Sequence, residues 1–515
     1  MTKSKSLDQL RRDAKALGKA LVAGDIGAKL RVQGIINEPK NGRYRHADFL
    51  HVIARETGYA TWPSLKLAVE TQGMDRAQKQ GRLRWALFNG SAETVSQLLA
   101  DYPDLAVDNV PLLVALYDVS AMRNMLAKDP ATATRDYPPR RPMCHLAFSR
   151  HIQAAPEKAA DMIAMAELLL AHGADVNDSF AFEPGSEHRL SALYGAVGHG
   201  NNMPLARWLL EHGANPNDDE SLYHSTELGH TEGLRLLLEH GANPEGTNAL
   251  PRAIDFNSIE SARLLLEAGA DPNEGIVSHP SGEPSLVIPA LHQAARRLAS
   301  GELAQLLLDH GADPLAVSRG HTPYAFARIF GNRAVAEVLE RAGAASPLSD
   351  VEAQLARAAD DACRPNDRIV MNKLSEEMKY LLGRLVWREG TLPHMKRLVS
   401  MGFDANLPDE MGMPPLHLAG WEGMPDVMSF FIEQKPNLNH TNAYGGTLLS
   451  TIIHGSENCP QRANREHIEC AQLALEFGVE LPRKASQFAT NPEMSDFLED
   501  WAESNPDQVV EHGVA

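Results

Sequence analysis

The 515-residue sequence has few cysteines, few aromatic residues and no long hydrophobic run. Its four cysteines, Cys144, Cys363, Cys459 and Cys470, form no CxxC pair, so the sequence supports neither a zinc-ribbon spacing nor a disulfide framework. No apolar stretch approaches the length that spans a bilayer, and the basic N-terminus lacks the apolar core of a signal peptide. We therefore expect no membrane partner and a cytoplasmic location.

Positive charge is also in short supply, because 49 Lys and Arg stand against 67 Asp and Glu, a net charge of −18. An acidic surface repels phosphate backbones, so we expect no nucleic-acid partner, and a basic or mixed protein partner is favoured. The chain contains no GxSxG motif, no P-loop, no Rossmann glycine pattern and no HExxH motif. The familiar enzyme classes are therefore unsupported.

What the sequence does contain is one phrase that recurs along the chain. The copies are LLLAHGADVN from Leu168, LLEHGANPN from Leu209, LLLEHGANPE from Leu236, LLLEAGADPN from Leu264 and LLLDHGADPL from Leu306. Each leucine run predicts a packed helix, and the glycine that follows it suits a left-handed helix end. An apolar segment with helical spacing precedes each phrase, so each unit is predicted to be a pair of antiparallel helices.

These phrases resemble the ankyrin repeat, whose TPLH motif is best matched by HTPYAFARIFGN at His321 and PPLHLAGWEG at Pro414. The resemblance is strongest over residues 143–345 and fainter on either side. It implies an all-α ankyrin-repeat solenoid, in which each helix pair is stable only because its neighbours cover its apolar faces. It also implies a recognition scaffold that binds a protein or peptide on its concave face.

The chain divides on this pattern into two arrays with helical caps. Residues 1–73 are predicted to form two amphipathic helices around a polar loop at 37–46, similar to the helical leader of bacterial ankyrin-repeat proteins. The predicted parts are the leader 1–73, a first array 74–345, a helical joint 346–376, a second array 377–482 and a C-terminal cap and tail 483–515.

The loops between the repeats differ in length. Gly213, Gly241 and Gly269 are spaced 28 residues apart, whereas an ankyrin unit has about 33. The loops at 178–190 and 274–288 are longer than usual. Two short loops between two long ones predict a notch in the concave face.

Polar residues replace commoner apolar or small ones at this notch. His224 and Glu227, three residues apart on a predicted helix, are candidates for a proton-transfer pair, and Arg252 could hold a carboxylate or phosphate. The alternative to a protein-binding scaffold is therefore an enzyme or small-ligand receptor centred on the notch. The candidate catalytic residues are His224, Glu227 and Asp255; the candidate binding residues are His188, His199, Arg252, His279, Gln293, Arg296 and Trp421.

A merely solvated surface explains the same residues equally well, because polar side chains on an exposed concave face cost little. Metal binding would require His188, His199, His224 and His279 to converge with Glu227 or Asp255, and none of them has a local ligand spacing. We therefore predict no metal site and no cofactor.

Overall fold

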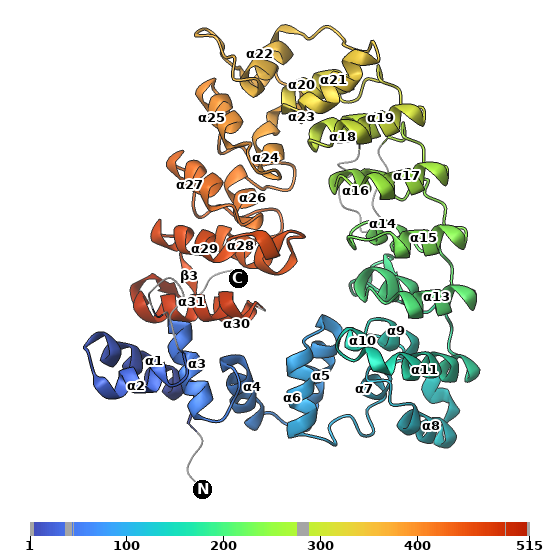
Figure 1. The fold of residues 1–515 in the computed structure, drawn as a ribbon, viewed down its shortest axis with the longest axis vertical. Coiled ribbons are helices and arrows are strands. Elements are labelled where there is room, and N and C mark those ends of the chain that lie inside the picture. Colours follow the sequence, from blue (N-terminus) through green and yellow to red (C-terminus); the bar gives the residue numbers. More distant parts are fainter. Residues whose placement is uncertain (1–4, 37–43, 45, 276–287, 490, 512–515) are drawn as a thin grey trace. The chain divides into compact units, whose positions relative to one another are not determined.

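The computed structural model describes residues 5–36, 44, 46–275, 288–489 and 491–511, and these are mainly α-helical. The helices form antiparallel pairs that stack one on the next, which confirms the predicted all-α solenoid (Figure 1). No helix among the described residues has both the length and the apolar character needed to cross a membrane.

The repeated phrase builds the second helix of each pair. In α15 (Glu232–Glu239), Leu234, Leu236 and Leu237 are buried, and the helix gives way to Gly241 with φ +87°. The corresponding glycines of the other four phrases also have positive φ, between 87° and 97°. The predicted left-handed helix ends are therefore confirmed.

The Asn or Asp that follows each glycine joins neighbouring repeats. The Asn177 side chain accepts a hydrogen bond from the backbone N–H of Asn215 at 2.7 Å, and Asn217 accepts one from Asn243 at 2.7 Å. These bonds satisfy backbone donors in loops that have no sheet partner. The loop sequence thus fixes the stacking of one helix pair on the next.

The described residues fall into two compact units. The first contains residues 5–253 and 263–270, and the second contains residues 254–262, 271–275 and 288–511. Helices α16 (Ala249–Asp255) and α17 (Ile259–Glu267) contribute residues to both. The domain boundaries predicted from the sequence stay predictions.

The helices of the first unit form two rows. The first-helix row, in which each helix contacts the next, is α5 (Arg76–Asn89), α7 (Val110–Ala115), α9 (Pro142–Ala147), α12 (Ala192–Tyr194) and α14 (Ser221–Ser225). The second-helix row is α6 (Ala92–Asp101), α8 (Val119–Lys128), α11 (Ala159–Ala171), α13 (Met203–Glu211) and α15. The short helix α10 (His151–Ala154) follows α9.

The second unit continues the same pairing. Its elements are α18 (Ala290–Arg296), α19 (Gly301–Asp309), α20 (Pro323–Phe330), α21 (Arg333–Arg341), α22 (Asp350–Ala359), α23 (Glu376–Lys379), α24 (Leu381–Val386), α25 (Leu392–Ser400), α26 (Pro415–Trp421), α27 (Pro425–Glu433), α28 (Leu448–Asn458), α29 (His467–Glu476), β3 (Leu481–Pro482), α30 (Ala485–Phe488), α31 (Pro492–Ser504) and β4 (Val509–Val510). Strand β4 pairs in parallel with β3, so the C-terminal segment returns to the end of the last helix pair.

The N-terminal region departs from its prediction, because it contains four helices and not two. They are α1 (Leu7–Val22), α2 (Ile26–Gln33), α3 (His46–Glu56) and α4 (Trp62–Gln72). Gly24 at φ +82° ends the first, and the Asp25 side chain then caps the second; Gly58 at φ +94° separates the last two. Most of the predicted polar loop, residues 37–43 and 45, lies outside the described residues.

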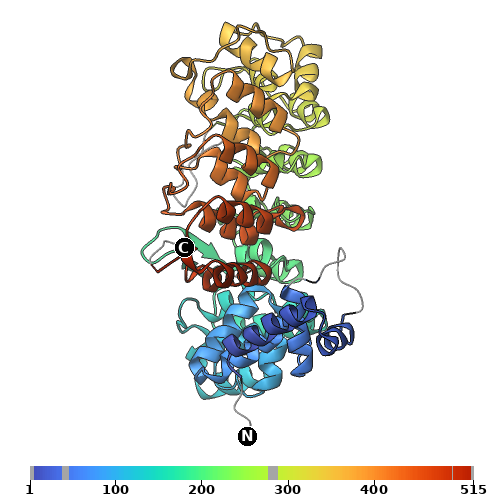
Figure 2. The ribbon, with the colours of Figure 1, turned by 90° about the vertical axis from the view of Figure 1, so that its left-hand side faces the viewer.

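The first long loop folds into a hairpin, which Figure 2 shows from the side. Strands β1 (Ser179–Ala181) and β2 (Arg189–Ser191) pair antiparallel, with Ser179 opposite Ser191. The hairpin leads into α12 and then into a π-helical turn, η4 (Gly195–His199), where the N–H of Gly200 bonds the carbonyl of Gly195 at 2.8 Å. Most of the second long loop, residues 276–287, lies outside the described residues.

Candidate functional site

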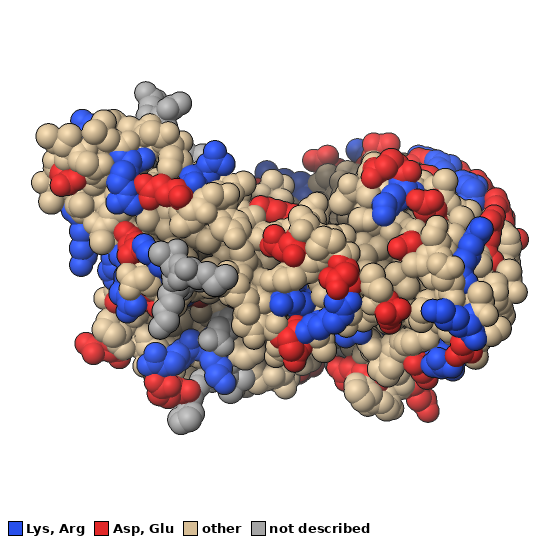
Figure 3. Space-filling model, turned by 90° about the horizontal axis from the view of Figure 1, so that it is seen from below, with Lys and Arg blue, Asp and Glu red and all other residues tan. Residues whose placement is uncertain are grey.

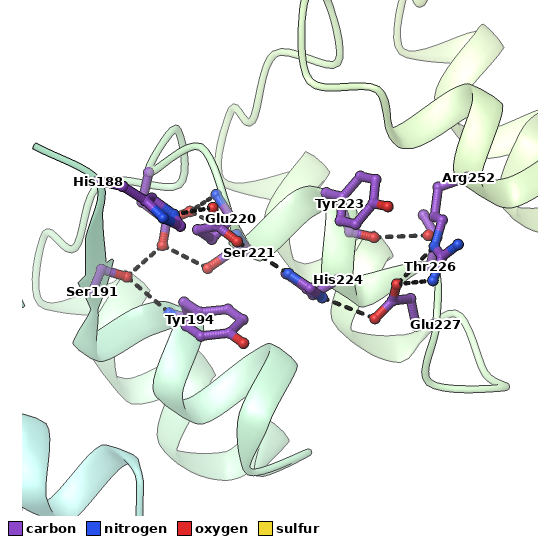
Figure 4. Close-up of polar contacts among 11 residues, drawn as sticks. His188, Ser191, Tyr194, Glu220, Ser221, Tyr223, His224, Thr226, Glu227 and Arg252 are labelled. Carbon is purple, nitrogen blue, oxygen red and sulfur yellow. Dashed lines mark hydrogen bonds and ion pairs between the residues drawn. The ribbon is translucent and has the colours of Figure 1, made fainter. Parts of the chain in front are cut away.

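A chain of ionisable side chains crosses three successive repeats of the first unit (Figure 4). His188, next to strand β2, lies 2.5 Å from one carboxylate oxygen of Glu220, whose other oxygen lies 3.0 Å from Nε2 of His224. Nδ1 of His224 lies 2.8 Å from Glu227, and Glu227 accepts from Nε of Arg252 at 2.7 Å. We call these five residues the charge network.

Helix geometry places the central members of the charge network. Glu220 precedes α14, and its backbone N–H donates to Asp218, which also accepts from the N–H and hydroxyl of Ser221. His224 is four residues after Glu220 and three before Glu227, so all three share one side of the helix. The structure thus brings the predicted residues His224 and Glu227 together.

The charge network holds His224 in its protonated form. Burial disfavours the charged ring, but hydrogen bonds to Glu220 and Glu227 outweigh it and raise the pKa of His224 to about 9. Burial likewise works against both carboxylates, yet the hydrogen bond from His224 and nearby positive charge keep the pKa of Glu220 and of Glu227 below the ordinary value. His224 is therefore an imidazolium donating from both nitrogens at neutral pH, which does not suit a general base.

Four members of the charge network, from Glu220 to Arg252, lie in residues 193–275, which match the family model of ankyrin repeats as three copies. Ankyrin repeats are thus detected in this chain. Among solved structures, the human ASB11 ankyrin repeat domain is similar over 48% of this chain and 96% of its own, at 17% sequence identity and a TM-score of 0.24. An ankyrin repeat domain from Acinetobacter baumannii AYE is similar over 38% of this chain and 98% of its own, at 27% identity and a TM-score of 0.30. No curated protein matches the chain.

Aromatic rings form a line along the first-helix row. Phe88 on α5 lies 6.1 Å from Phe148, which follows α9, and Phe148 lies 5.8 Å from Tyr194 on α12. Tyr194 lies 5.0 Å from the His224 ring, which lies 5.0 Å from Tyr223. We call these five rings the aromatic row; sequence reasoning missed it, because its members are 29 to 60 residues apart except for the last two.

The glycines of the preceding repeat, Gly195 and Gly198, leave no open space beside the charge network. A Cβ atom at Gly195 would lie 2.5 Å from the ring of Phe148, and one at Gly198 would lie 2.6 Å from the ring of Tyr194. Aromatic rings therefore occupy the space that a side chain at either glycine would need. His199 also packs there, with its ring 4.1 Å from Phe88 and Nε2 bonded to the Phe88 carbonyl at 2.8 Å.

Three predicted residues, Asp255, Gln293 and Arg296, belong to the second unit and form a separate cluster. Gln293 and Arg296 are 3% and 4% exposed, so they are buried and not part of an open polar floor. Gln293 donates to Asp255 and accepts from Arg296 at 2.5 Å, and Arg296 pairs with Glu377 at 3.1 Å. Glu377 is buried and also pairs with Arg319 at 2.5 Å. Sequence reasoning missed Glu377, because it lies outside the repeated phrases.

The remaining predicted residues fall elsewhere. Trp421, also in the second unit, lies 5.1 Å from the ring of His454, and its carbonyl accepts from His467 at 2.8 Å. His279 lies outside the described residues. Within the described ranges, no group of three His, Cys, Asp or Glu side chains is arranged to hold a metal ion.

Proposed function

We propose that this chain is a cytoplasmic recognition scaffold that binds a protein partner along the aromatic row, on the concave face of its first array. The observation that carries the proposal is that rings from α5, the end of α9, α12 and α14 contact one another in turn. Phe88, Tyr194 and Tyr223 are half-buried, so each ring is anchored and still presents a surface. Aromatic and arginine side chains of this kind supply much of the binding energy at protein interfaces.

The charge network supports the same role. The side chains of His224, Glu227 and Arg252 are 25%, 26% and 22% exposed, and each is already fixed by a partner. Side chains held in place lose little conformational entropy on binding, which favours a preorganised surface. The Arg252 guanidinium lies 5.5 Å from the Tyr223 ring, so the network continues directly into the aromatic row.

The alternative of an enzyme or small-ligand site at His224 and Glu227 has less support. Acid–base catalysis at neutral pH needs a group that exchanges its proton readily there, and His224 is held protonated by two carboxylates. The space beside Gly195 and Gly198 is filled by aromatic rings. The chemistry of this site is therefore that of a fixed polar surface.

Site-specific photo-crosslinking tests the proposal. A photoreactive phenylalanine replaces Tyr223 in the first-helix row or, as the matched control, Glu239 on the exposed side of α15. Illumination in the native cytoplasm should give a discrete polypeptide adduct at position 223 and none at position 239. Adducts only at position 239, or none at position 223, would contradict the proposal; a retained small molecule in place of a polypeptide would favour the alternative.

A further inference from the structure

One arginine beside the aromatic row is held without a counter-ion. The Arg140 guanidinium lies 4.4 Å from the ring centre of Phe88, 4.9 Å from that of Phe148 and 4.6 Å from that of Phe180. These rings come from α5, the end of α9 and β1, so three separate elements converge on one cation. Stacking uses the flat faces of a guanidinium and leaves its edge N–H groups for an acceptor.

Arg84 adds a second positive charge at the same place. It lies on α5 four residues before Phe88, which puts the two side chains on the same side of the helix. Burial, and the nearby Arg84, lower the pKa of Arg140 to about 10, so the two cations act on each other. Within the part of the chain that the structure describes, neither arginine pairs with a carboxylate or donates a side-chain hydrogen bond.

The neighbouring arginine differs in this respect. Arg141 pairs with Asp136 at 3.3 Å and lies 3.8 Å from Asp178. The chain has 67 acidic residues, and Lys and Arg are interspersed with Asp and Glu over the face seen in Figure 3. Within the described residues, no carboxylate neutralises the positive charge of Arg140 and of the nearby Arg84.

We infer that Arg140 and Arg84 bind a side-chain carboxylate of an acidic segment in the partner protein. This inference rests on the proposed function and deepens it, because it names the chemistry of the partner. The edge of a guanidinium matches the two oxygens of a carboxylate, and contacts with three phenyl rings hold Arg140 in place. The net charge of −18 does not decide the charge of the group that contacts Arg140, since salt screens interactions with charges farther away than about 8–10 Å.

Peptide binding to the full-length chain tests the inference. The probe is a fluorescein-labelled dodecapeptide of alternating glutamate and glycine, followed by fluorescence anisotropy, with the lysine–glycine peptide as its counterpart. Wild type should bind the glutamate peptide at least about tenfold more tightly than the lysine peptide, and added salt should weaken that binding. The Arg140→Gln, Arg84→Gln double variant should lose at least about tenfold in affinity.

Two further variants control for folding and for general charge. Arg84→Gln alone leaves the Arg140 stack in place and should weaken binding to a smaller extent. Arg207→Gln removes an exposed arginine from α13, in the second-helix row, and should leave binding unchanged. Equal binding of the glutamate peptide to wild type and double variant, or a preference for the lysine peptide, overturns the inference.

The two tests fail in different ways. If a polypeptide adduct forms at position 223 but peptide binding does not depend on Arg140 and Arg84, the recognition-scaffold proposal stands and only the inference of an acidic partner is rejected. If the glutamate peptide binds through the two arginines but no polypeptide adduct forms, the recognition-scaffold proposal is rejected and Arg140 and Arg84 form only an anion-binding site.

Discussion

At the residue scale, His224 contributes as a charged donor. Its two ring nitrogens bond two carboxylates, and one of these, Glu220, is only 2% exposed. A carboxylate buried to that degree is stable only with a positive partner, so the network needs the imidazolium form. The protonation state of the His224 ring therefore determines whether the charge network, which joins three repeats, is stable.

We predict that stability falls as the pH rises from 6.5 to 9. The pKa of His224 is raised in the folded chain to about 9 from an ordinary 6.5, so its stabilisation is complete below pH 6.5 and is lost as the pH passes through 9. The urea-unfolding free energy of wild type should drop by about 2 kcal/mol over this range relative to His224→Gln. The control His240→Gln, an exposed histidine outside the network, should follow wild type. Parallel pH profiles for wild type and His224→Gln would contradict the account.

At the scale of the element, the helix ends are set by single glycines. Gly241 has φ +87°, and nothing lies within 4 Å of the position of a Cβ there, so any penalty for a side chain comes from the backbone. Gly81 lies inside α5 with equal space and no positive φ. Comparing the same substitution at these two positions therefore measures the cost of backbone strain in the absence of steric crowding.

We predict opposite effects of the same substitution at these two glycines. Gly241→Ala should destabilise by about 1–2 kcal/mol, because an L-residue pays for the left-handed region. Gly81→Ala should stabilise by about 0.5–1 kcal/mol, because alanine favours a helix interior. Thermal melting of both variants measures the difference; a destabilised Gly81→Ala or an unchanged Gly241→Ala would show that these ends are set otherwise.

The same local character explains what could be predicted from the sequence. A leucine run followed by glycine specifies a helix and its end within ten residues, and the spacing from His224 to Glu227 specifies one side of a helix. Contacts made through loops could not be predicted: His188 meets Glu220 only because the β1–β2 hairpin places it there. The stack of Arg140 on Phe88 likewise joins residues 52 positions apart, which no periodicity records.

At the scale of the whole molecule, each helix pair is stabilised by its contacts with the neighbouring pairs. In a solenoid each repeat contacts only its neighbours, so a defect acts locally before it acts globally. Leu237 in α15 is fully buried, and α15 packs on α13 and α14. The destabilisation caused by truncating Leu237 should therefore be largest in the adjacent helices and decrease with distance along the solenoid.

We predict that Leu237→Ala destabilises by about 2–5 kcal/mol and that the loss is uneven along the chain. Hydrogen exchange should accelerate most in α13, α14 and α15, while α26 and α28 keep their wild-type protection. An equal increase in exchange in every helix would indicate a single cooperative core.

Hydrogen exchange of the full-length chain, with and without the polypeptide captured at position 223, tests the central claim most directly. The account predicts that the partner protects α12, η4 and α14, together with the loop that carries Arg140, and leaves α13 and α15 unchanged. Protection confined to α13 and α15, or absent from the first-helix row, would contradict it.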